Sequence, residues 1–166
     1  MKSTAAKICG SVALVAFLVS CSPAHQPNIQ SRSQQLASES AAAFNAKDYG
    51  KAQKLAVEAT RIDPQFAEAW VGYGMASVRL EQTTIARQAY ERALSLHQAR
   101  HRQDPLDPNQ VFQQIYLLVL LGRPAEAEKL LSQARTDYPN DEQISKLAGN
   151  FAATTPGWAS WSVGTK

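Results

Sequence analysis

Cysteine is scarce in this chain of 166 residues, which contains only Cys9 and Cys21. Because both lie near the N-terminus, no residue after Cys21 carries a thiol. A disulfide framework needs paired cysteines along the folded region, and zinc ribbons and redox dithiols need two closely spaced cysteines. The sequence excludes these classes, so packing must stabilise the fold.

Sequence motifs of catalysis and nucleotide binding are also missing. Gly72 and Gly74 flank Tyr73 without the further glycine and lysine of a phosphate-binding loop, and there is no Gly-x-Ser-x-Gly elbow. His97 and His101 are one helical turn apart, but no glutamate lies between them and no third ligand is nearby. We interpret them as a solvated, basic helix end. The sequence therefore predicts no catalytic residue, no metal ligand and no cofactor.

A strong excess of one charge is absent as well. The net charge is +3, and two of the positive charges are Lys2 and Lys7 in the N-terminal segment. Without a basic stripe along any predicted element, we expect no nucleic-acid partner.

The chain has one long hydrophobic run, Ile8 to Val19, which is too short to span a membrane as a mature helix. It follows the basic residues Lys2 and Lys7 and precedes a small residue, Ser20. This order is typical of a secretory signal peptide, predicted over residues 1–20.

The four residues 18–21, Leu-Val-Ser-Cys, further resemble the bacterial lipobox, in which cleavage occurs before a cysteine that has received a diacylglyceryl group. The resemblance implies lipidation of Cys21 with acyl chains such as palmitate, and two or three chains give stable anchoring. Ser22, where an aspartate would favour inner-membrane retention, indicates the outer membrane, with the protein facing the periplasm. The alternative is an ordinary secretory signal with a chance cysteine. The polar, proline-containing residues 21–34 read as a flexible tether.

The stretch from Phe66 to Ala93 has the pattern of a helical hairpin. Two amphipathic segments are separated by the polar residues 82–84, so they must fold back on each other. Gly74 on the first segment, with Ala86 and Ala93 on the second, allows the backbones to approach closely while large aromatic side chains fill the space around them.

The pair Ala86 and Ala93 recurs along the chain. It has equivalents 34 residues earlier at Ala52 and Ala59, and 41 residues later at residues 127 and 134. The longer interval predicts an insertion of one or two helical turns after Ala93, read as an extended helix and a longer link over residues 94–106. Prolines at positions 64 and 139 close the first and third units.

This pattern resembles the tetratricopeptide (TPR) repeat. The resemblance implies an all-α fold: a TPR helical-hairpin solenoid of about three repeats over residues 35–151, with a C-terminal capping helix from Glu142 to Phe151. The residues that carry it are Tyr49, Ala52, Ala59 and Pro64; Trp70, Tyr73, Gly74, Ala86, Tyr90 and Ala93; and Ala127, Leu131, Ala134 and Pro139.

Helix boundaries can be predicted from caps and prolines. The first helix is expected from Ser33 to Ala46, and the fifth, apolar nearly all round, from Pro108 to Leu121. Asp63-Pro64 and Asp107-Pro108 are both predicted to begin a helix, with the aspartate as N-cap and the proline in the first helical position.

TPR domains bind partners in a concave groove lined by the first helix of each pair, which implies a partner site here. The clamp residues with which some TPR domains hold a C-terminal carboxylate are replaced by Ala37 and Ala41, so a chaperone-type function of this kind is not expected. The implied groove is apolar and suits an amphipathic helix or an extended peptide better. The alternative is that Met75 and Phe112 are plain core residues. The implied groove residues are Ala41, Phe44, Asn45, Val71, Met75, Val78, Arg79, Phe112, Tyr116, Val119 and Leu120.

The tail, residues 152–166, is not helical in pattern but contains Trp158 and Trp161. Two tryptophans three residues apart are unusual in a free tail. They either fold back onto the domain, which we favour, or bind a partner or the membrane interface.

Lipobox and repeats together resemble TadD-type lipoproteins of Tad/Flp pilus assembly and the pilotins of type IV pili and secretion systems. This resemblance implies a non-catalytic adaptor, anchored in the outer membrane, that helps a secretin or pilus component to assemble. An adaptor for peptidoglycan enzymes or for outer-membrane protein assembly is the alternative, and an envelope enzyme is a third interpretation without a supporting motif.

Overall fold

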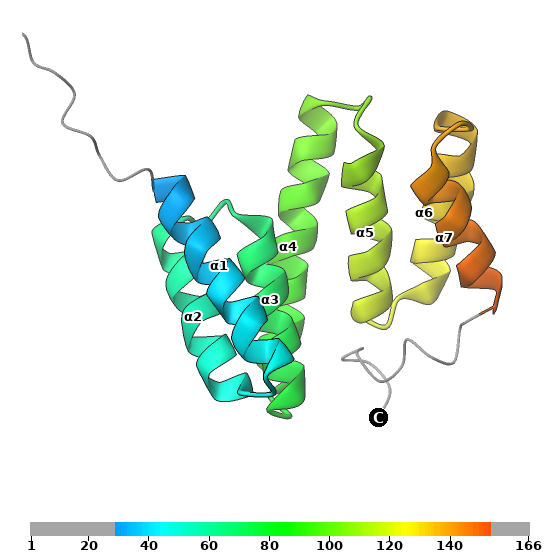
Figure 1. Ribbon diagram of the computed structural model, residues 1–166. Coiled ribbons are helices and arrows are strands. Elements are labelled where there is room, and N and C mark those ends of the chain that lie inside the picture. Colours follow the sequence, from blue (N-terminus) through cyan, green and yellow to red (C-terminus); the bar gives the residue numbers. More distant parts are fainter. Residues whose placement is uncertain (1–28, 154–166) are drawn as a thin grey trace, which may run out of the picture.

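The structure of the chain is a computed structural model that describes residues 29–153, and these residues form seven α-helices and no strand (Figure 1). The predicted signal peptide, Cys21 and the tail with Trp158 and Trp161 lie outside the described residues. The helices are α1 (Ile29–Asn45), α2 (Tyr49–Ile62), α3 (Ala67–Arg79), α4 (Thr83–Gln103), α5 (Pro108–Leu120), α6 (Pro124–Asp137) and α7 (Glu142–Ala153).

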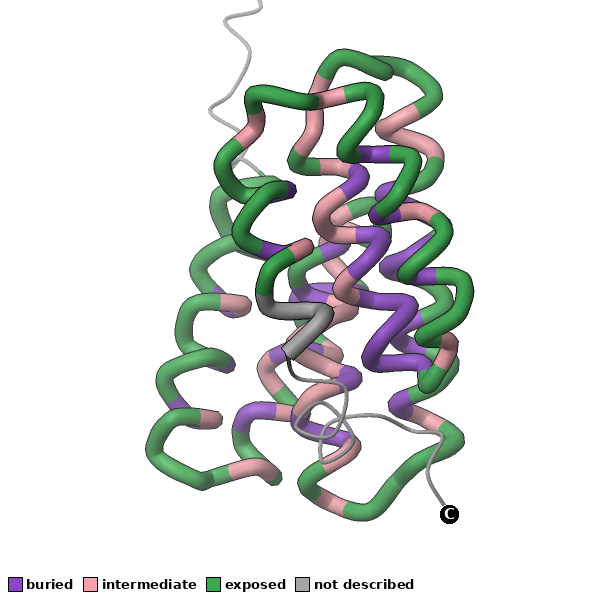
Figure 2. Tube along the Cα trace, turned by 90° about the vertical axis from the view of Figure 1, so that its right-hand side faces the viewer, coloured by how far each residue is buried: buried purple, intermediate pink, exposed green. Residues whose placement is uncertain are grey.

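Successive helices pair as antiparallel hairpins, α1 with α2, α3 with α4, and α5 with α6. The hairpins stack through contacts between α2 and α3 and between α4 and α5, while α7 packs on α5 and α6. Figure 2 shows that the buried residues lie along the inner faces of these helices. The predicted all-α, TPR-like solenoid with a final capping helix is thereby confirmed.

The departure from the 34-residue period lies entirely within α4. This helix has 21 residues, against 14 each in α2 and α6, so the seven additional residues form about two extra turns. The predicted extension of the helix is confirmed. The predicted longer link is wrong, because residues 104–107 between α4 and α5 are as few as residues 63–66 between α2 and α3.

The two Asp-Pro pairs behave differently. Asp107 is the N-cap of α5, as predicted: its side chain accepts a hydrogen bond from the Asn109 amide, and Pro108 opens the helix. Asp63 instead ends α2, and its carboxylate turns the chain by accepting from the Gln65 amide at 2.9 Å. The prediction that Asp63-Pro64 begins a helix is therefore wrong, since α3 starts only at Ala67, after Phe66.

Helix α1 begins at Ile29, four residues before the predicted start and inside the segment read as a tether ending at residue 34. Its buried face is a stripe of Ser33, Leu36, Ser40 and Ala43 at helical spacing. Because two of these four are serines, the apolar periodicity is too weak to show in the sequence. Ser33 is fully buried, and its hydroxyl donates to the Gln30 carbonyl within the same helix.

Gly74 and Tyr90 make the closest approach between α3 and α4. Both are buried, and a Cβ atom added at Gly74 would overlap the ring of Tyr90. The space left by the missing side chain on α3 is therefore occupied by an aromatic ring from α4. The predicted close packing of this hairpin around Gly74 is confirmed.

His97 lies in the buried face of the α4 extension, with only 2% of its surface exposed. Its Nδ1 lies 2.9 Å from Gln110 Oε1, and Gln110 in turn donates to the Asp107 carboxylate that caps α5. Since the amide oxygen can only accept, Nδ1 carries the proton in this arrangement. The prediction of a solvated residue is wrong for His97, because α5 covers this side of the extension.

Gly74→Ala should destabilise the fold. Replacing glycine by alanine in a helix normally raises the free energy of unfolding by as much as about 1 kcal/mol. At position 74, overpacking against the Tyr90 ring lowers it by about 1–3 kcal/mol. Gly72→Ala is the matched control, because a Cβ there meets nothing closer than 3.8 Å. Urea midpoints should fall for Gly74→Ala and hold or rise for Gly72→Ala; equal midpoints would contradict the packing described.

Stability should fall as the pH drops below about 6.5. Desolvation lowers the pKa of His97 in the folded state, against smaller opposing effects from Gln110, Glu68 and Asp107. The unfolded chain therefore binds the extra proton first, and the stability contributed by the neutral ring is lost as the pH falls from 6.5 towards the lowered folded-state pKa. Between pH 7.5 and pH 5, the urea midpoint of His97→Gln should fall less than that of the native chain; equal falls would contradict this.

Candidate functional site

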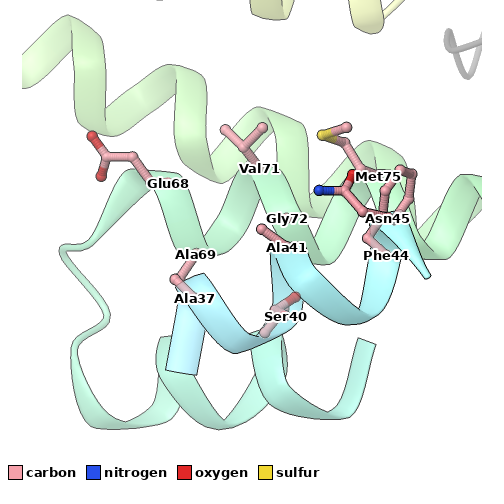
Figure 3. Close-up of a pocket in the computed structure, with 11 residues that line it drawn as sticks. Ala37, Ser40, Ala41, Phe44, Asn45, Glu68, Ala69, Val71, Gly72 and Met75 are labelled. Atoms are coloured by element: carbon pink, nitrogen blue, oxygen red, sulfur yellow. The ribbon is translucent and has the colours of Figure 1, made fainter. Parts of the chain in front are cut away.

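A cavity of about 280 Å³ opens between α1 and α3, with α2 as its floor (Figure 3). Its wall consists mainly of carbon atoms and of small residues. The lining residues are Ala37, Ser40, Ala41, Phe44 and Asn45 from α1, Ala56 from α2, and Glu68, Ala69, Val71, Gly72 and Met75 from α3.

Small side chains at helical spacing create this cavity. Ala37 and Ala41 are one turn apart on α1, and Gly72 faces them from α3. A Cβ atom added at Gly72 would come no closer than 3.8 Å to the Ser40 hydroxyl and 4.0 Å to the Ala56 Cβ. Helices α1 and α3 contact each other through their deeper residues, and the space between their outer residues stays open.

The polar groups of the cavity are satisfied or lie at its ends. The Ser40 hydroxyl donates to the Ala52 carbonyl at 2.8 Å, so it presents no free donor to a ligand. Glu68 lies at one end and Asn45 at the other (Figure 3). The Glu68 carboxylate is 3.7 Å from the Arg100 guanidinium in a half-exposed ion pair. The arrangement suits an apolar group in the middle, with polar contacts at both ends.

Five of the predicted groove residues line this cavity: Ala41, Phe44, Asn45, Val71 and Met75. Arg79 lies one turn beyond Met75, where its guanidinium carbon is 6.0 Å from the centre of the Tyr49 ring. That ring also packs on Phe44, with centroids 5.2 Å apart. Arg79 thus extends the polar end of the same face without lining the cavity.

The predicted residues of the third repeat are placed elsewhere. Phe112 and Tyr116 on α5 are half-buried against the core formed by α4 to α7, and the cavity does not include them. Across the described helices, no Cα of α3 comes within 8 Å of α5, whereas α1 and α3 are in contact. The two extra turns of α4 displace α5 along the stack, so the groove is not continuous over three repeats (Figure 1).

Two groove assignments on α5 are wrong. Val119 and Leu120 are 8% and 1% exposed, within the core shared with α6 and α7. A helix that is apolar nearly all round gives no signal for which side faces a groove. For Met75 the two sequence interpretations are compatible, because this residue lines the cavity and also packs on the core.

Sequence reasoning did not assign Ser40, Ala56, Glu68, Ala69 and Gly72 to a site. Four of them are small, and small residues facing each other across two helices can signal either close packing or a cavity. Glu68 is exposed, and an acidic residue on an exposed helical face gives no signal of a site in the sequence.

Two further features are absent from the described residues. No group of three or more His, Cys, Asp and Glu residues is arranged to hold a metal ion there. None of the described helices has both the length and the apolar character needed to cross a membrane.

Comparisons with known proteins give structural matches only. No protein-family model and no curated protein sequence matches the chain. It is similar to two structures of SycD, the type III secretion translocator chaperone of Yersinia enterocolitica, both at 20% identity. The TM-scores are 0.52, covering 78% of this chain and 92% of SycD in its alternative dimer, and 0.51, covering 75% and 87%.

A chain of the CopN–Scc3 complex is also similar, with a TM-score of 0.50 and 20% identity over 74% of this chain and 68% of that one. At this level of identity the likeness shows the fold and nothing finer.

Proposed function

We propose that this protein is a TPR-type adaptor that binds a partner protein by receiving one of its apolar side chains between α1 and α3. The observation that carries the proposal is the cavity of about 280 Å³ with its carbon-rich wall. An apolar cavity of about 150 Å³ holds a benzene molecule, so this one has room for an aromatic or long aliphatic side chain.

The small residues make this cavity a suitable receptor. Because Ala37 and Ala41 are small, the α1 side of the cavity is open to solvent. A side chain presented by a helix or an extended peptide can enter there. Asn45 and Glu68 can then bind polar groups of the partner on either side of the buried one. An apolar anchor surrounded by polar contacts is the arrangement that dominates affinity in many protein interfaces.

We further propose that the adaptor is anchored in the outer membrane through lipidated Cys21, faces the periplasm, and assists a pilus or secretion machine in the manner of TadD-type lipoproteins and pilotins. The lipobox-like residues 18–21 support the anchor. SycD is, by its name, a chaperone of type III secretion, which makes a secretion client a reasonable class to test. The alternative is an adaptor for peptidoglycan enzymes or outer-membrane protein assembly. In both cases the role is non-catalytic.

Photo-crosslinking in intact envelopes tests the proposal. A benzophenone amino acid at Asn45, beside the cavity, should capture the partner, and one at Glu58, exposed on α2, should not. Ala41→Trp should abolish capture by filling the cavity. Ala42→Trp should preserve it, because residue 42 is also exposed but does not line the cavity.

Capture that survives Ala41→Trp, or equal capture from Glu58, would overturn the cavity as the binding site. The captured protein decides between the finer readings. A secretin or pilus component supports the first, and a peptidoglycan enzyme or an outer-membrane assembly factor supports the alternative.

A further inference from the structure

The three links that join successive repeats are built alike. In each, the amide of the fourth residue donates to the carbonyl of the first: Phe66 to Asp63, Asp107 to Asp104, and Asp141 to Tyr138. The second residue of each link is proline. The third residue is Gln65 in the first link and Asn140 in the last, but Leu106 in the middle one.

Leu106 is 86% exposed, although its link is firmly braced. Its amide donates to the Asp104 carboxylate at 3.2 Å, and the Tyr138 hydroxyl donates to the carbonyl of Pro105. Pro105 and Pro108 fix the backbone on either side. A single exposed leucine is common on protein surfaces. This one is held on a rigid turn at the position where the equivalent links carry an amide.

The extension of α4 also places this link at an extreme point of the molecule. Two extra turns carry it about 10 Å beyond the position that a 14-residue helix would reach. In Figure 1 it forms the top of the stack, at the same end as the start of α1. Ile29, which begins α1, is 57% exposed, and no other large hydrophobic residue is exposed in the part of the chain that the structure describes.

The start of α1 is also where the predicted lipid anchor joins the fold. Eight residue steps separate Cys21 from Ile29, and fully extended they span at most about 29 Å. The start of α1 must then stay within about 29 Å of the anchored cysteine, and the α4–α5 link with Leu106 lies at the same end of the molecule (Figure 1). Arg102, exposed in the last turn of α4 and four residues before Leu106, can bind lipid phosphate groups at the bilayer surface.

We propose that the α4–α5 link rests on the membrane, with Leu106 inserted at the interface between headgroups and acyl chains. This inference rests on the proposed anchoring through Cys21. One leucine binds a bilayer weakly by itself, but a short tether confines it beside the surface and makes the second contact intramolecular. Two contacts at one end fix the orientation of the stack, so the cavity between α1 and α3 is held beside the bilayer.

Fluorescence quenching in vesicles tests the contact. The processed, lipidated chain has no free thiol, so a fluorophore can be attached through Gln103→Cys, next to the link, or through Lys51→Cys at the opposite end as control. In vesicles of phosphatidylethanolamine and phosphatidylglycerol, nitroxide lipids labelled near the headgroup should quench the label at position 103 and not the one at position 51. Leu106→Gln, which copies the first link, should reduce the quenching at position 103 at least twofold.

The outcomes separate the two proposals. A chain that does not float with the vesicles removes the lipid anchor itself. A chain that floats but shows no quenching at position 103, or the same quenching after Leu106→Gln, overturns the membrane contact alone. If Leu106→Gln instead changes the oligomeric state of the purified chain or the capture of its partner, Leu106 belongs to a protein interface and the membrane contact is wrong.

Discussion

The length of α4 is the constraint on which the arrangement of the other elements depends. Adding seven residues to a 14-residue repeat helix leaves its later residues facing almost the same direction around the helix axis, because two turns take 7.2 residues. The inner faces of the second and third repeats therefore still match, and the core continues from α4 into α5 and α6. What changes is the position of α5, which is displaced along the axis of α4. This displacement separates α5 from α3, confines the cavity to the first two repeats, and raises the α4–α5 link above the α2–α3 link (Figure 1).

Sequence reasoning succeeded where residue size and spacing determine the geometry. Only one close antiparallel pairing fits the interval between Gly74 and Tyr90 and the alanines at helical spacing near them. The hairpin and the repeat could therefore be predicted. It failed where polar residues take structural positions. Ser33 and Ser40 are buried with hydrogen bonds inside the first hairpin, and His97 is buried beneath α5. No periodicity of apolar residues marks such positions. Of the eleven residues that the repeat pattern implies for a groove, the five that line the cavity are on α1 and α3. The place of the four on α5 depended on how far α5 is displaced, which an interval of 41 residues does not reveal by itself.

The two proposed surfaces use opposite means to present apolar contacts. Between α1 and α3, small side chains leave a recess that receives a large group from outside. At the α4–α5 link, a large side chain is held out on a braced turn. A recess suits a partner that can insert a side chain, and a projection suits a soft surface that can accept one. Under the proposed anchoring, the two contacts together would let the chain bind a partner while it keeps a fixed orientation towards the membrane.

Insertion of a partner side chain between α1 and α3 is the central claim, and Met75 reports on it directly. The sequence contains two methionines, Met1 and Met75, and Met75 lies in the wall of the cavity. Removal of the predicted signal peptide would leave Met75 as the one methionine of the processed chain. A carbon-13 label in the methionine methyl group therefore gives a single signal. On addition of the partner captured by crosslinking, that signal should shift and show a nuclear Overhauser effect to an apolar side chain of the partner. A Met75 signal that stays unchanged in the saturated complex would contradict the claim.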